Sequence, residues 1–181
     1  GIIVEPLEPR DWITENQRMF PSINAGRYFI HGSHYRKPPP PGRIGICLDP
    51  GRAFGSGDHA TTRGCLLALD WLVRSRKFVT LLDMGCGSGI LAIAMARTWP
   101  AGRIWAADND RRAVSVAADN SRRNGVGNRI RTMAGDGYGS RKLINCGPYD
   151  LIVSNILANP LCRMAADLGR NLNRAGNRGG V

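Results

Sequence analysis

The stretch Asp83–Gly89 constrains the fold of this chain more than any other, because it places three glycines at alternate positions. The apolar run 78–82 directly precedes it, and the apolar segment 90–96 directly follows it. This order predicts a buried strand, a glycine turn and a helix. Glycine takes positive φ without steric cost and lets a ligand approach the main chain closely. A helix that begins here also offers backbone N–H groups to a polar ligand.

The spacing of the glycines indicates which kind of ligand the turn would hold. A dinucleotide-binding turn reads G-x-G-x-x-G, and its third glycine would fall where this chain has Ile90. The glycines are instead Gly85, Gly87 and Gly89, preceded by the acidic residue Asp83. This variant resembles the S-adenosylmethionine loop of Rossmann-like methyltransferases, whose cofactor has no pyrophosphate. A tight turn is the simpler interpretation, but three glycines lose much backbone entropy for that purpose alone.

Length and composition are typical of a soluble globular domain. The chain has 181 residues, of which 43% are hydrophobic and 22% charged, enough for one domain with a core. No apolar run is long enough to cross a membrane, and residues 1–10 lack a signal-peptide pattern. The five cysteines are odd in number and form no C-x-x-C pair, so the pattern suggests neither a metal site nor a disulfide framework. A reducing, cytoplasmic setting is the simplest expectation.

The net charge of +11 is high for this length. One interpretation is an acidic partner, such as RNA or a ribosome surface. The other is solubility together with a general use of arginine, because the arginines are scattered and no basic patch with interleaved aromatic residues occurs. The sequence leaves both interpretations open.

The chain is expected to divide at residue 43. Residues 1–43 look like a leading segment with a proline-rich linker, and residues 44–181 look like one cofactor-binding domain. Within the leading segment, Ile23, Tyr28 and Ile30 would supply a short strand or two. The run 37–42, K-P-P-P-P-G, is expected to be an extended spacer because proline fixes φ.

Apolar runs and helical spacings alternate along residues 44–181. The pattern predicts strands over 44–48, 78–83, 103–107, 129–134 and 149–154, and helices over 60–74, 90–98 and 111–124. A last helix is expected to have Asn159 as its N-cap and Pro160 as its first residue. This α/β alternation predicts a doubly wound, mostly parallel sheet. The segment Gly179–Val181 resembles the beginning of another strand, so the sheet is expected to be truncated at its C-terminal end.

Two acidic residues follow predicted strands. Asp108 ends the second core strand, 23 residues after Gly85, where a carboxylate would accept both ribose hydroxyls of the cofactor. Asp110 is the competing candidate, although it is expected to cap the next helix. Asp136 follows the third strand and would accept the adenine amino group, but a simple turn formed with Gly137 explains it equally well.

A second glycine-rich stretch, residues 48–62, leads into a predicted helix. Phe54 and Gly55 lie among small residues and are expected to form a lid over the cofactor. Thr62 enters the first helical turn, where hydroxyl and N–H groups would meet the methionine carboxylate. His59 is a candidate base, but a local hydrogen-bond partner is the simpler interpretation.

Asn155 follows the fourth core strand. Ligands of open α/β sheets lie beyond the carboxyl ends of the strands, so Asn155 is expected near the reacting methyl group. A structural role in the turn is the alternative, because a buried asparagine needs hydrogen-bond partners.

Five motifs together resemble one family. They are L-D-P-G-x-A-F-G-x-G-x-H-x-T-T, D-x-G-C-G-S-G-I-L-A-I-A, A-D-N-D-x-x-A-V, D-N-x-x-x-N-G-V and V-x-N-I-L-A-N-P-L. From about residue 11 to residue 172 the chain is similar to the ribosomal protein methyltransferases that modify stalk-base protein L-eleven of the bacterial large subunit. The resemblance implies a cytoplasmic, S-adenosylmethionine-dependent protein N-methyltransferase of the class I fold. That family also carries an amino-terminal substrate domain and further carboxyl-terminal strands, which this chain is expected to lack.

Residue by residue, the resemblance implies cofactor contacts at Thr62, Gly85, Asp108 and Asn155, with the loop around Phe54 over the methionine end. Asn155 is the candidate catalytic residue, because its amide oxygen and the carbonyl just after it would accept hydrogen bonds from the attacking amine and aim its lone pair. Two alternatives stay open. The basic charge would also suit an RNA methyltransferase, although no N-P-P-Y motif is present. The second alternative is that the chain is a truncated, inactive cofactor-binding module.

Overall fold

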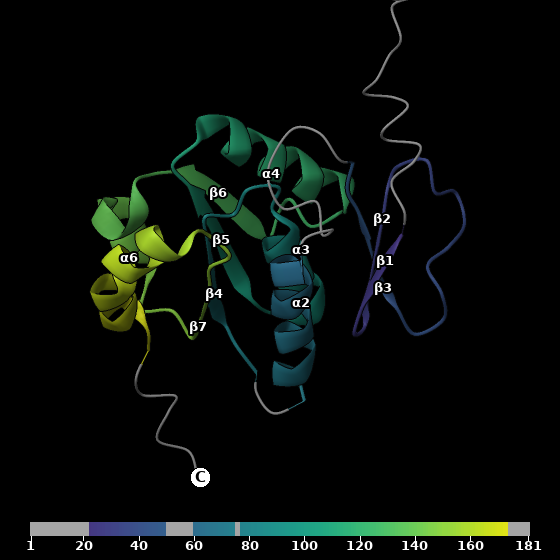
Figure 1. The fold of residues 1–181 in the computed structure, drawn as a ribbon, viewed down its shortest axis with the longest axis horizontal. Helices are drawn as coiled ribbons and strands as arrows, with labels where there is room; N and C mark the ends of the chain where they lie inside the picture. The colour runs from purple at the N-terminus through teal and green to yellow at the C-terminus, as the bar shows by residue number, and fades with distance from the viewer. Residues whose placement is uncertain (1–21, 50–59, 75–76, 174–181) are drawn as a thin grey trace, which may run out of the picture.

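The computed structural model describes residues 22–49, 60–74 and 77–173. They form a main sheet, a smaller sheet and helices around them (Figure 1). The main sheet consists of β4 (Thr80–Met84), β5 (Arg103–Asp108), β6 (Ile130–Ala134) and β7 (Leu151–Val153). Its strand order is β6-β5-β4-β7 and every pair is parallel. The predicted α/β fold with a parallel, Rossmann-like sheet is confirmed.

Helices cover both faces of the main sheet. They are α2 (Ala60–Leu72), α3 (Ile90–Thr98), α4 (Arg111–Arg123), α5 (Arg141–Cys146) and α6 (Ala158–Asn171), with the 3₁₀ turn η1 (Gly137–Gly139) before α5. Successive strand residues alternate between the two faces: Leu81 packs in the core under α2 and α3, and Leu82 packs in the core under α5 and α6. This alternation is why the sheet can be doubly wound.

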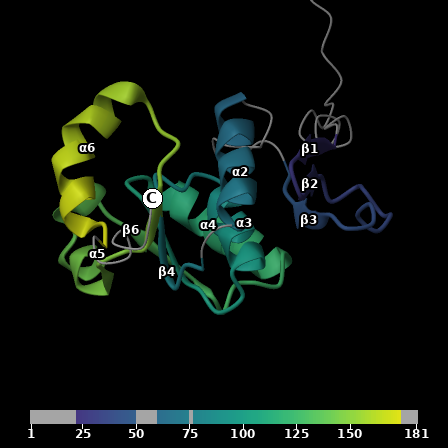
Figure 2. The same ribbon diagram turned by 90° about the horizontal axis from the view of Figure 1, so that it is seen from below.

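Helix α3 is apolar on all sides, and residues 90–96 are all buried. A helix of this kind needs neighbours around its whole circumference. The main sheet lies on one side of it and the small sheet on the other, as Figures 1 and 2 show. The helix therefore forms the centre of the larger hydrophobic core.

The small sheet consists of β1 (Ile23–Ala25), β2 (Tyr28–His31) and β3 (Ile44–Cys47), in that order. β1 and β2 pair antiparallel, whereas β2 and β3 pair parallel. The short strands predicted around Ile23, Tyr28 and Ile30, and the strand predicted from Ile44, are present. The sequence did not predict that β3 pairs with β2, across the division placed at residue 43. That division into two regions stays a prediction.

Helix α6 begins two residues earlier than predicted. Its N-cap is Leu157, and the Leu161 N–H donates to the Leu157 carbonyl at 3.2 Å. Asn159 and Pro160 therefore lie inside the first turn, so the prediction of Asn159 as the N-cap was wrong. Proline is tolerated there because N–H groups of the first turn have no partner within the helix. None of the helices in the described ranges is long and apolar enough to span a membrane.

The chain after α6 returns to the outer edge of β7. Leu172 bridges Tyr149 in parallel, the Tyr149 N–H donates to the Asn171 carbonyl at 2.8 Å, and the Asn173 N–H donates to the Tyr149 carbonyl at 2.7 Å. The further strand predicted at Gly179–Val181 lies outside the described residues.

Candidate cofactor-binding site

The predicted site residues gather at the carboxyl edge of the main sheet. Asp83 lies near the end of β4, Asp108 ends β5, Asp136 follows β6 and Asn155 follows β7. From β4 the strand order runs to β5 and β6 on one side and to β7 on the other. Such a reversal opens a crevice beyond the strand ends, which is where ligands of open α/β sheets bind.

The glycine loop is held by backbone hydrogen bonds and three left-handed residues. Gly85, Gly87 and Gly89 have φ values of 74°, 51° and 80°. The N–H groups of Gly85 and Cys86 both donate to the Ala107 carbonyl, at 2.8 and 3.0 Å. The Gly89 N–H donates to the Cys86 carbonyl at 2.7 Å, and α3 begins at the next residue. The predicted strand, glycine turn and helix are confirmed.

Two of these positions require glycine for two reasons: their φ values are positive, and neighbouring atoms leave no room for a Cβ atom. A Cβ atom on Gly85 would lie 2.2 Å from Cγ2 of Ile156, in the loop after β7. A Cβ atom on Gly89 would lie 3.0 Å from the Cβ of Ala117 in α4. The loop is therefore enclosed by neighbouring segments, and the tight-turn interpretation explains part of the glycine pattern.

Asp108 is fixed against the glycine loop. It is half-buried; its Oδ2 accepts the Gly87 N–H at 2.9 Å and its Oδ1 accepts the Asp110 N–H at 3.0 Å. The Asp110 side chain accepts the Arg112 N–H at 2.8 Å and is the N-cap of α4. The capping role predicted for Asp110 is confirmed, and this leaves Asp108 as the carboxylate of the loop.

Asp83 lies beneath the loop and is 1% exposed. Its Oδ2 accepts the Ala92 N–H at 2.9 Å, whereas its Oδ1 has no hydrogen-bond partner among the described residues. Burial raises the pKa of Asp83 to about 7; the bond from Ala92 opposes this rise and the charge of Asp108 adds to it. The carboxyl group therefore changes its charge near neutral pH, next to the proposed ligand site.

Thr62 and Asn155 are in contact, although 93 positions separate them in the sequence. Asn155 Nδ2 donates to Thr62 Oγ1 at 3.0 Å, and Thr62 is fully buried in the first turn of α2. The neighbouring Ser154 Oγ donates to the Met84 carbonyl at 2.9 Å. The loop after β7 is thus tied both to α2 and to the end of β4.

The remaining predicted residues are less constrained. Asp136 is exposed and its side chain does not cap η1, but the Gly135 N–H donates to the Asp108 carbonyl at 3.0 Å and keeps this loop beside β5. Phe54, Gly55 and His59 lie outside the described residues. Two open surface hollows, of about 540 Å³ between α4 and β6 and about 570 Å³ between the small sheet and α2, lie away from the glycine loop.

Sequence reasoning missed two asparagines with buried side-chain hydrogen bonds, one to the glycine loop and one to the small sheet. Asn120 donates from Nδ2 to the Ser88 carbonyl at 2.9 Å, and Asn124 bonds to the backbone of Cys47. The sequence pattern that could have identified them is the spacing of the two asparagines, one helical turn apart on the face that also carries Ala113 and Ala117. That spacing shows a shared face but not its partners.

Comparison with known sequences places the chain in a family. The model of the family Ribosomal protein L11 methyltransferase (PrmA) matches residues 2–179. The ribosomal protein L11 methyltransferase of Rhizobium etli is 44% identical over 176 residues, which are 97% of this chain and 60% of that protein. The protein of the same name from Brucella suis is 43% identical over 173 residues, 96% of this chain and 60% of that protein. The chain therefore spans about 60% of the length of these relatives.

Solved structures show the same fold. The ribosomal protein L11 methylase of Lactobacillus delbrueckii subsp. bulgaricus superposes with a TM-score of 0.75 at 31% identity, over 85% of this chain and 76% of that chain. An O-methyltransferase from Bacillus cereus in complex with SAH superposes with a TM-score of 0.55 at 20% identity, over 64% of this chain and 54% of that chain, which supports the fold alone. Together with the match over residues 2–179, these similarities show that the chain belongs to the ribosomal protein L11 methyltransferase family.

Proposed function

We propose that this chain binds S-adenosylmethionine at the carboxyl edge of its main sheet and forms the catalytic part of a protein N-methyltransferase. The proposed substrate is ribosomal protein L-eleven, and the proposed setting is the cytoplasm. Family membership supports the reaction class. The observation that carries the location is Asp108, bonded at 2.9 Å to the Gly87 N–H of the glycine loop.

The residues at this edge suit the chemistry of the cofactor. S-adenosylmethionine has a positively charged sulfonium and ammonium group, a ribose with two hydroxyls and no phosphate. Asp83, Asp108 and Asp136 place three carboxyl groups at this edge in a chain of net charge +11. Carboxylates attract cations and accept from hydroxyls, whereas they would repel a pyrophosphate. The unpartnered Oδ1 of Asp83 offers a buried acceptor beneath the loop.

The cofactor, when bound, supplies a methyl group activated by its positively charged sulfur. The protein has to orient the acceptor amine and keep it neutral. Deprotonation at pH 7 costs a lysine of pKa ~10.4 roughly 4–5 kcal/mol, and costs an α-amino group about 1 kcal/mol. In our proposal Asn155 orients the amine: its Nδ2 is engaged with Thr62, and its amide oxygen accepts a hydrogen bond from the amine N–H and aims the nitrogen lone pair.

Replacing Asn155 with alanine is expected to lower kcat about a hundredfold while cofactor affinity changes much less. The reason is that the side chain would act on the attacking amine rather than on the adenosine. The assay uses a full-length enzyme containing this chain, with L-eleven as the substrate. Thr62→Val, which removes the acceptor for Asn155 Nδ2, is the companion variant and should show a smaller loss. Normal turnover by Asn155→Ala would exclude its catalytic role.

Replacing Asp108 with alanine is expected to weaken S-adenosylmethionine binding at least thirtyfold, because hydrogen bonds to a charged acceptor contribute about 1.5–3 kcal/mol each. Calorimetric titration of the chain is the measurement. Asp110→Ala is the matched control: it removes the same charge two residues away but only the cap of α4, at a cost of about 1 kcal/mol in stability. Equal losses of affinity in both variants would argue against a specific ribose contact.

The titration also separates the competing functions. A well-folded chain that binds no cofactor would favour an inactive module. A chain that binds cofactor is next offered L-eleven and ribosomal RNA, because the charge of +11 keeps an RNA target worth testing. Methylation of RNA but not of L-eleven would overturn the proposed substrate.

A further inference from the structure

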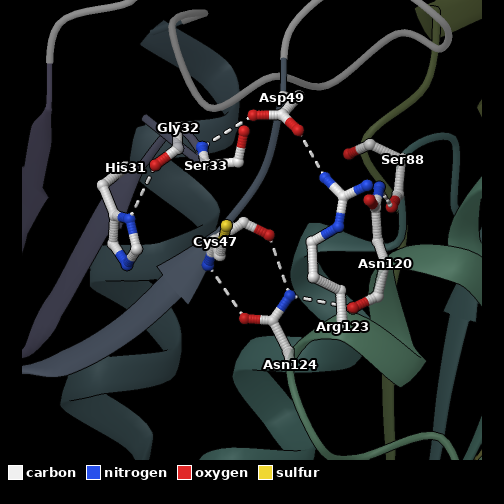
Figure 3. Close-up of polar contacts among 9 residues, drawn as sticks. All are labelled: His31, Gly32, Ser33, Cys47, Asp49, Ser88, Asn120, Arg123 and Asn124. Carbon is white, nitrogen blue, oxygen red and sulfur yellow. Dashed lines mark hydrogen bonds and ion pairs between the residues drawn. The ribbon is translucent and has the colours of Figure 1, made fainter. Parts of the chain in front are cut away.

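Helix α4 presents a buried polar face that the proposed reaction does not use. Asn120 and Asn124 are 7% and 5% exposed. Buried amide side chains need hydrogen-bond partners, since an unpaired one costs free energy. The partners of these two lie in different parts of the molecule, one in the glycine loop and the other in the small sheet (Figure 3).

Asn120 holds the end of the glycine loop. Its Nδ2 donates to the Ser88 carbonyl at 2.9 Å. One helical turn earlier, Ala117 packs against Gly89, where an added Cβ would come within 3.0 Å. The bond and the contact together fix the peptide between Ser88 and Gly89, which is the N-cap of α3.

Asn124 holds the edge of the small sheet. Its Oδ1 accepts the Cys47 N–H at 2.8 Å, and its Nδ2 donates at 2.8 Å both to the Cys47 carbonyl and to the Asn120 carbonyl. Because β3 is an edge strand, the side-chain amide takes the place of a neighbouring strand at Cys47. Both N–H donors of the amide are used, so an aspartate of the same shape would face two carbonyl oxygens without a proton to donate.

Charged contacts surround this attachment. Arg123 forms an ion pair with Asp49, whose Oδ1 accepts the Ser33 N–H at 2.7 Å (Figure 3). Arg97 in α3 donates from Nη2 to the Asn124 carbonyl at 2.7 Å. The C-terminal end of α4 is therefore attached to the small sheet and to α3 at the same point.

We propose that Asn120 and Asn124 are positioning residues which couple the small sheet to the cofactor loop through α4. The helix contacts the loop with Asn120 and Ala117, and its C-cap Asn124 contacts the sheet, so a shift at its C-terminal end displaces the group that holds the Ser88 carbonyl. The inference rests on the proposed function, since it assigns a role in binding S-adenosylmethionine. Its consequence is that a change at β3 alters cofactor affinity without touching the loop.

The test combines titration with hydrogen exchange. The chain and its Asn120→Asp, Asn124→Asp and double variants are titrated with S-adenosylhomocysteine. Each single variant is expected to lose about three- to tenfold in affinity, and the double variant less than the product of the two losses. Amide exchange at Gly89 should be faster in Asn124→Asp. Arg122→Ala, which removes only an exposed ion pair with Asp119 on the same helix, should stay within about twofold of the unchanged chain.

Each outcome decides the proposal. Unchanged affinity in Asn124→Asp, or a double variant equal to the product of the singles with unchanged exchange at Gly89, would overturn the coupling. If the unchanged chain binds no ligand, the proposed function fails, and exchange at Gly89 alone then decides the coupling. Should Asn124→Asp not fold, Asn124→Ser takes its place, because serine keeps one donor and an acceptor.

Discussion

Replacing Gly85 with alanine is expected to destabilise the fold by about 2–5 kcal/mol and to abolish S-adenosylmethionine binding. Gly85 has φ 74°, which a side chain disfavours, and its added Cβ would lie 2.2 Å from Cγ2 of Ile156. Ile156 is β-branched and cannot easily move this methyl group aside. The loop has to shift, and the carbonyl and N–H groups that it presents shift with it. Urea denaturation measures the loss of stability, and calorimetry measures the loss of binding.

Two further variants separate the strain from the contact. Gly125 has φ 68° with nothing within 4 Å of an added Cβ, so Gly125→Ala should show the backbone cost alone, about 1–2 kcal/mol. The double variant Gly85→Ala/Ile156→Ala removes the methyl group that would be too close. It is compared with Ile156→Ala alone, and the remaining cost of the alanine at position 85 should approach that of Gly125→Ala. If Gly85→Ala costs no more than Gly125→Ala, the close approach of Ile156 does not constrain the loop.

The central strands and helices were predictable because their signals are local. The run before Asp83 is apolar apart from Thr80, as expected for a strand buried on both faces, and α3 and α4 lie within one residue of their predicted bounds. The alternation of strands and helices then predicts a parallel sheet, because two parallel neighbouring strands need a long crossover connection, and a helix supplies it. The carboxyl-edge position of Asp83, Asp108 and Asn155 follows from that topology.

The small sheet and the polar contacts of α4 were not predictable in the same way. The pairing of β2 with β3 joins segments on either side of a proline-rich linker. The local residue pattern predicts that each segment is a strand, but it does not predict which strands pair. The bond between Asn124 and Cys47 spans 77 positions, and that between Asn155 and Thr62 spans 93. A side-chain amide has the same appearance in the sequence whether it faces solvent or replaces a strand. The partners of such residues emerge only from the assembled fold.

Replacing Asp83 with asparagine is expected to raise the free energy of unfolding, and to raise it more at pH 8 than at pH 5. Burial raises the pKa of Asp83 to about 7 in the folded state, whereas an aspartate in the unfolded chain has a pKa of ~3.9. Between about pH 4 and pH 7 the folded protein holds a proton that the unfolded chain has released, so this group lowers stability as pH rises. Above pH 7 the full cost of the buried charge remains, on the order of 4 kcal/mol. Asparagine carries no charge at either pH and removes this dependence.

The difference in unfolding free energy between Asp83→Asn and the unchanged chain reports mainly this group, because titrating residues that do not interact with Asp83 contribute equally to both. It should grow with pH between 4 and 7 and then level off; a difference that is constant with pH would contradict a raised pKa. Cofactor affinity, in contrast to stability, should be higher when Asp83 is ionised. If the ionised carboxyl attracts the positive charge of S-adenosylmethionine, the affinity lost in Asp83→Asn should be larger at pH 8 than at pH 6. If both results hold, the ionised Asp83 lowers stability but strengthens cofactor binding. Binding would then explain why an acidic residue is buried at this position.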